Sequence, residues 1–65
     1  MIVLHRLTHP DHPFVVNADQ ILTVEANPDT VISLQNGTKF VVSESPDEVV
    51  ALVRAWRASI LRLAA

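Results

Sequence analysis

The spacing of apolar residues changes once along the chain, close to residue 45. Residues 2–43 alternate in short runs with the period of two that β-strands show, whereas residues 46–64 have the period of an α-helix. Turn-forming residues divide the first part into separate runs. We therefore predict strands over residues 2–7, 14–16, 21–26, 30–35 and 38–43, followed by one helix.

Two connections carry clear turn chemistry. Residues 8–13 hold two prolines, which remove backbone donors and fix φ, so the pattern predicts a loop there. Asn36-Gly37, with apolar alternation on both sides, favours a two-residue type I′ turn, in which both positions need positive φ. Residues 30–43 are therefore predicted to form an antiparallel hairpin.

The start of the helix is marked by Ser45-Pro46-Asp47-Glu48. Ser45 is a good N-cap, Pro46 suits the first helical position, and Glu48 completes a capping box. From there to about Leu63 the chain carries an apolar stripe at helical spacing. Its members are Val49, Leu52, Val53, Trp56, Ile60 and Leu63.

The helix has more apolar surface than one small sheet needs. A stripe of about 100° is typical, but here Val50 and Leu61 widen the arc to about half of the circumference. Val50, Arg54, Arg57 and Leu61 form a mixed flank beside the stripe. Two interpretations stay open: a wide core face with half-exposed borders, or a second contact surface for another chain. We expect Trp56 to lie in the core.

These elements predict an α+β fold, in which an antiparallel β-meander of about five strands carries one C-terminal helix. Short connections favour pairing of strands that follow one another in the chain. We expect one domain over residues 1–65, with strands in 1–43 and the helix in 46–64. Open sheet edges and surplus apolar surface favour self-association. The chain is thus predicted to be a homo-oligomer that uses the helix flank or a sheet edge.

Composition narrows the classes of function. The chain has 65 residues, 49% of them hydrophobic, no cysteine and a formal net charge of −2. So small a chain buries little surface, and without cysteine it has no disulfide to stabilise it. No apolar run reaches the length of a membrane helix, and the N-terminus does not resemble a signal peptide. We expect a cytoplasmic protein without direct membrane insertion.

Candidate chemistry is sparse. His5, His9 and His12, with Asp11 between the last two, invite a metal site, but no fourth ligand accompanies them at a typical spacing. Asp19 and Asp29 fall at turns and Asp47 and Glu48 at the helix start, and one glycine cannot build a phosphate-binding loop. We therefore predict no catalytic, metal-binding or cofactor-binding residues.

Nucleic-acid binding is a further alternative, because small antiparallel sheets often bind RNA with exposed aromatic and basic side chains. Here Phe14, Phe40 and Trp56 are expected in the core, and Arg6 and Lys39 are the only basic residues of the strand region. We predict that the chain binds no nucleic acid. RNA binding remains as the contrasting hypothesis, with steep salt dependence as its signature.

A sequence of short motifs runs through nearly the whole chain. It comprises Asn17-Ala18-Asp19, Ile21, Val24-Glu25, Pro28-Asp29-Thr30, Ile32, Leu34, Gly37, Val41-Val42 and Glu44. In this order and spacing the chain resembles the small flagellar proteins of the FlbD/SwrD type, which end in a helix. Two features depart from that pattern: the long, proline-rich segment 8–13, and Leu22, where a polar residue is more usual.

The resemblance implies a cytoplasmic accessory of flagellar and swarming motility, with no known enzymatic activity or cofactor, that acts by protein contact. Some members of the family support swarming by raising the power of the flagellar motor. The resemblance therefore implies motor or regulatory proteins as partners, but it identifies no binding residues. From the residues themselves we take Leu22, Val50, Arg54, Arg57 and Leu61 as candidate protein-contact positions. A self-assembling structural module is the alternative.

Overall fold

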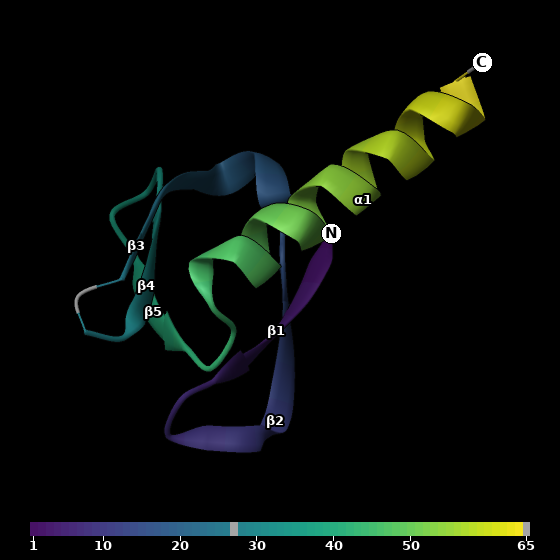
Figure 1. Cartoon of the computed structure of the whole chain (residues 1–65). Helices are drawn as coiled ribbons and strands as arrows, with labels where there is room; N and C mark the ends of the chain where they lie inside the picture. The colour runs from purple at the N-terminus through teal and green to yellow at the C-terminus, as the bar shows by residue number, and fades with distance from the viewer. Residues whose placement is uncertain (27, 65) are drawn as a thin grey trace.

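The computed structural model describes residues 1–26 and 28–64, and the side chains as far as Leu61. A curled antiparallel sheet holds one long helix, whose C-terminal half extends beyond the strands (Figure 1). The elements are β1 (Ile2–Arg6), β2 (His9–Val16), a 3₁₀ turn η1 (Ala18–Gln20), β3 (Ile21–Ala26), β4 (Thr30–Leu34), β5 (Lys39–Val42) and α1 (Pro46–Ala64). The predicted α+β class, with a five-stranded antiparallel sheet and one C-terminal helix, is confirmed.

The order of strands in the sheet is β2-β1-β5-β4-β3. Consecutive strands pair at three connections, as short links favour, but β2 and β3 lie at opposite edges. The two halves of the sheet join where β1 pairs with β5, with Arg6 opposite Val42. Backbone hydrogen bonds from Leu7 N to Val41 O and from Ser43 N to His5 O strengthen this junction.

The loop predicted over residues 8–13 was wrong, because residues 9–13 belong to β2. This strand begins at His9 and lies opposite β1, with Pro13 facing His5 and a register shift between His5 and Arg6. A proline cannot donate to a strand ladder, so it is tolerated mainly on edge strands and at bulges. β2 offers both conditions, and its prolines explain why it takes an edge position rather than lying beside β3.

The turn between β4 and β5 also differs from the prediction. Among the described residues, none except Gly37 has a positive φ, and Gly37 has φ 90°. A type I′ turn at Asn36-Gly37 is therefore wrong. Instead Gly37 N donates to Leu34 O and Leu34 N donates to Thr38 O, which closes a three-residue loop with glycine in the left-handed region. The predicted hairpin itself is confirmed.

The helix begins as predicted. The backbone N–H of Glu48 donates to the Ser45 hydroxyl at 3.1 Å, and the Ser45 N–H donates to the Glu48 carboxylate at 3.4 Å. This reciprocal pair is a capping box, and it satisfies backbone donors that the first turn of a helix leaves unpaired. The helix therefore leaves the sheet at a defined residue, directly after β5.

The core lies between the helix-facing side of the sheet and the first turns of α1. Its buried members are Ile2, Leu4, Val16, Ala18, Ile32, Val42 and Val49. Trp56 is half-buried and packs against this cluster from farther along the helix, as do Phe14 and Phe40 from the strands. The Leu63 side chain, predicted in the same stripe, lies outside the described residues.

Candidate functional site

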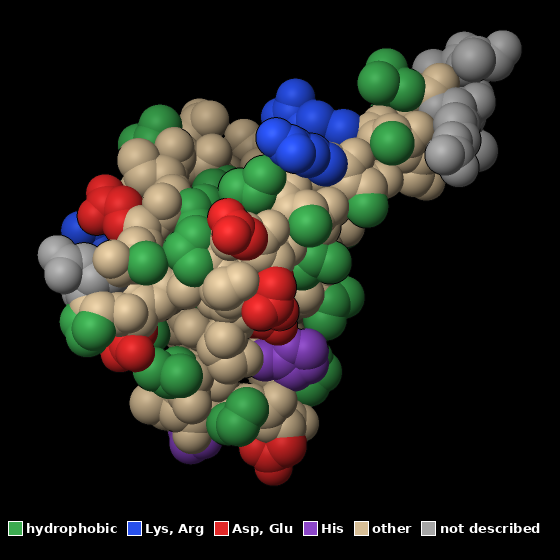
Figure 2. Space-filling view, in the orientation of Figure 1, with side chains coloured by type: hydrophobic (Ala, Val, Ile, Leu, Met, Phe, Trp, Pro, Cys, Tyr) green, Lys and Arg blue, Asp and Glu red, His purple; other side chains and the backbone are tan. Residues whose placement is uncertain are grey.

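One side of α1 carries the mixed flank, which we call the arginine flank: Val50, Arg54, Arg57 and Leu61. All four side chains are exposed, with Leu61 at 69%. The steps of four, three and four residues place them along one side of the helix. Figure 2 shows Lys or Arg side chains clustered over the middle of α1, with hydrophobic side chains toward both ends. The sequence left two interpretations of this flank open, a half-exposed core border or a contact surface, and the structure shows its four side chains on the outside of the core.

Two grooves run beside the arginine flank, between α1 and the segment from η1 to β3. The inner groove has a volume of about 340 Å³ and an apolar floor. Its lining comes from η1, β3 and the first half of the helix: Ala18, Ile21, Val24, Val49, Val50, Val53, Arg54 and Arg57. Both arginines therefore stand beside an apolar surface.

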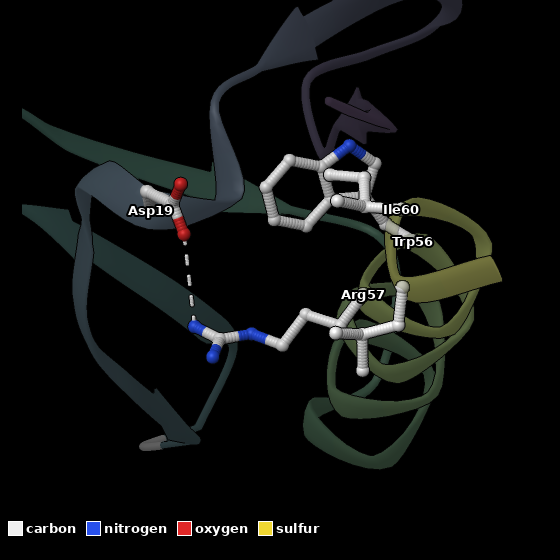
Figure 3. Close-up of a pocket in the computed structure, with 5 residues that line it drawn as sticks. Asp19, Trp56, Arg57 and Ile60 are labelled. Atoms are coloured by element: carbon white, nitrogen blue, oxygen red, sulfur yellow. Dashed lines mark ion pairs between the residues drawn. The ribbon is translucent and has the colours of Figure 1, made fainter. Parts of the chain in front are cut away.

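The outer groove, of about 250 Å³, continues along the helix where α1 extends past the sheet. Trp56, Ile60 and Leu61 form its apolar wall, and Arg57 lines both grooves. In Figure 3 the Arg57 side chain reaches across to Asp19 of η1, and its guanidinium lies 3.7 Å from the carboxylate. Both partners are about 60% exposed, so this ion pair contributes little to stability.

A β-bulge explains how β3 faces the inner groove. Ile21 lies opposite Leu34 and Thr23 lies opposite Ser33, which leaves Leu22 as the extra residue. The bulge breaks the alternation, so that Ile21 and Val24, three positions apart, both line the groove. Leu22 itself is 65% exposed and lines neither groove. The structure thus brings four of the five candidate contact residues together and places Leu22 apart, on an edge strand.

The opposite flank of α1 holds a different arrangement. His5 donates twice to Glu44: its backbone N–H reaches Oε1 at 2.9 Å, and its ring Nδ1 lies 2.6 Å from Oε2. This contact ties β1 to the segment between β5 and α1. A third groove lies beside it, with Val3 and Leu52 as its larger apolar residues and Glu48 near Glu44.

The Glu44 carboxylate responds to this environment. Its burial acts to raise its pKa, but the hydrogen bonds from His5, and the favourable interaction with the His5 ring, act in the opposite direction. The net result is that the pKa of Glu44 lies below its ordinary value of 4.5. Nothing in the local sequence pattern predicted this pair, because 39 positions separate the two residues. The acidic position of the family motif was the only available signal.

The other two histidines lie on β2, exposed, with their ring centroids 6.1 Å apart. Within residues 1–26 and 28–64 no three His, Asp or Glu side chains gather closely enough to hold a metal ion. In the same part of the chain, no helix is long and apolar enough to cross a membrane.

Phe14 and Phe40 pack on each other, with the Arg6 guanidinium 4.6 Å from the Phe14 ring centre.

Comparison with known families decides the identity. A family model described as "FlbD: Flagellar and Swarming motility proteins" matches residues 1–61. The chain belongs to the FlbD family. The resemblance seen in the sequence motifs is thereby confirmed, and the family points to a role in flagellar and swarming motility. FlbD proteins are a motility family and not a known enzyme family. No curated protein and no solved structure matched this FlbD chain.

The extent of the FlbD match bears on the site. Residues 1–61 include all five strands, η1 and the helix as far as Leu61. The arginine flank, both grooves beside it and the His5–Glu44 pair therefore all lie within the matched part. These surfaces belong to the FlbD domain itself rather than to an extension of it.

Proposed function

We propose that this chain supports flagellar and swarming motility from the cytoplasm as a non-catalytic binding protein. It contacts a motor or regulatory protein through the arginine flank of α1, and by that contact it supports the power of the flagellar motor. Family membership supports the motility role. The position of the flank supports the mode of action.

The observation that carries this proposal is the projecting helix. Buried Val49 holds α1 on the sheet, yet Ile60 and Leu61 in the C-terminal half of the helix are 42% and 69% exposed. That half of α1 extends beyond the strands (Figure 1). A soluble monomer rarely leaves a contiguous apolar surface open unless that surface has a partner. Trp56 and the arginines beside it are of the residue types that most often anchor protein interfaces.

The test is complementation of a deletion strain. We expect deletion of the gene to reduce swarming, and the natural protein to restore it. The Leu61→Glu variant is not expected to restore swarming, because it places a charge in the apolar part of the contact without disturbing the core. Torque measured on tethered cells should fall in the same strains if the protein supports the motor.

Val15→Glu is the matched control. Val15 is 62% exposed, close to the value for Leu61, but it lies on β2 away from the flank. Both variants should accumulate to the level of the natural protein. Only Val15→Glu should restore motility. Unchanged swarming in the deletion strain would refute the motility role of this protein, and full rescue by Leu61→Glu would remove the flank as the contact.

Self-association is a second candidate activity, and the two sheet edges favour one location for it. β2 carries two prolines, which block strand addition, whereas β3 has none and presents Leu22 outward at its bulge. We propose that copies of the chain contact one another at β3. Light scattering on a sizing column should show a multimer that Leu22→Glu dissociates; a natural protein that runs as a monomer would contradict it.

A further inference from the structure

We infer that the partner bound at the arginine flank is an acidic amphipathic helix of another protein, lying alongside α1. This inference rests on the proposed function and adds the chemistry and shape of the partner. Its apolar side chains would occupy the inner and outer grooves, and its carboxylates would pair with Arg54 and Arg57.

Charge is the first argument. The chain as a whole is negative, with a net charge of −2, yet the two grooves are lined by two arginines and a single acid, Asp19. Arg54 has no carboxylate partner among the described side chains, and Arg57 has only the exposed pair at 3.7 Å. Both guanidinium groups therefore remain available beside an apolar floor, which is the arrangement that complements carboxylates on an amphipathic segment.

Shape is the second argument, and it separates a helix from a strand. The flank from Val50 to Leu61 runs roughly 16 Å along α1, about three turns of a helix. A strand added to the open edge of β3 would reach the inner groove only, because no β3 residue lines the outer groove. A helix parallel to α1 reaches both grooves, with anchors spaced three and four residues apart.

The same charges disfavour a second copy of this chain as the occupant. In a two-fold symmetric pair the same patch lies on both sides of the interface. Two arginine flanks facing each other would bring four guanidinium groups together, with Asp19 of each copy as the only acid in the grooves. Like charges placed opposite one another at an interface oppose binding.

The experiment uses a synthetic helical peptide of about three turns. Its Leu, Glu, Glu and Leu residues are separated by four, three and four positions, as the flank residues are. This spacing is the same from either end of the peptide, so one peptide tests both orientations. A control peptide has Lys in place of both Glu residues. Trp56 is the only tryptophan of the chain and lines the outer groove, so its fluorescence reports occupancy of the site.

We expect the acidic peptide to shift the Trp56 emission and the basic peptide to leave it unchanged. Arg54→Glu and Arg57→Glu should each raise the dissociation constant about tenfold, and added salt should weaken binding. Val15→Glu should bind as the natural protein does. No binding of the acidic peptide, or equal binding of both peptides, would overturn the inference. So would a natural dimer that Leu61→Glu dissociates.

These outcomes are distinguishable from failure of the proposed function. If Leu61→Glu abolishes swarming while both arginine variants swarm normally and bind the acidic peptide as the natural protein does, the contact stands and the acidic partner is wrong. If the deletion strain swarms normally, the proposed function fails, whatever the peptides do.

Discussion

The two flanks of α1 differ in how their charged groups are engaged. On the side that faces β1, Glu44 accepts two hydrogen bonds from His5, and Glu48 takes part in the capping box with Ser45. On the side that faces β3, Arg54 has no carboxylate partner among the described side chains and Arg57 has one long, exposed pair. The charged groups of one flank thus hold segments of the fold together, while those of the other flank stay exposed, as the proposed contact requires.

The largest loss of stability is expected when the contact between α1 and the core at Val49 is weakened. Val49 is fully buried, whereas its neighbour Val50 is 42% exposed on the arginine flank. We expect Val49→Ala to lower the free energy of unfolding by about 1–3 kcal/mol, since it leaves a cavity in the core. Val50→Ala should be nearly neutral, because alanine favours the helix and little packing is lost. Chemical denaturation measures both, and equal effects would show that α1 is not seated by Val49.

Glu44→Gln should weaken the contact between His5 and Glu44 on the side of α1 that faces β1. We expect a loss of about 1–2 kcal/mol at neutral pH, because the substitution weakens a charge-assisted hydrogen bond from His5. Urea denaturation measures this loss. Glu25→Gln, at an exposed position of β3, is the control and should change stability little.

The pH dependence of stability sharpens the same contrast. The pKa of Glu44 is lower in the folded protein than its ordinary value of 4.5. Its contribution is therefore fully present above pH about 4.5 and is lost as the pH falls through the lower, folded pKa. The stability difference between the natural protein and Glu44→Gln should shrink below that pH. A difference that stays constant down to the acid transition would mean that the Glu44 charge is not involved.

The capping box should contribute less. Ser45→Ala removes the oxygen that accepts from the Glu48 N–H, and we expect a cost of about 1 kcal/mol. Thermal unfolding followed by circular dichroism provides the measurement. Thr8, which is exposed in the turn between β1 and β2, provides a control in Thr8→Ala. Equal stability of the two variants would show that the cap does not set the start of α1.

The smallest effect is expected on the arginine flank. Asp19→Ala removes the exposed pair with Arg57, and stability should change by no more than about 0.5 kcal/mol. Affinity for an acidic helix should rise slightly, because Arg57 then has no competing carboxylate. A large loss of stability would show that the Asp19–Arg57 pair holds the fold together, as the His5–Glu44 contact does on the other side of α1.

The predicted start of the helix was right, because a local capping motif specifies it. The strand predicted over residues 30–35, where alternation was clear, corresponds to β4. The segment after Thr8 was misjudged, since its prolines signal a loop locally but are compatible with an edge strand. The candidate contact residues of α1 could be found from the sequence, because a helix fixes which positions share a side.

Local patterns in the sequence determined the class of the fold, the number and type of its elements, and the arginine flank. Tertiary structure alone decided that β1 joins β5, that Leu22 stands apart at a bulge, that His5 meets Glu44, and that two grooves run beside the arginines. The reason is physical: periodicity and capping act between residues a few positions apart. The strand order and the grooves depend on contacts between residues far apart in the chain, which no local pattern specifies.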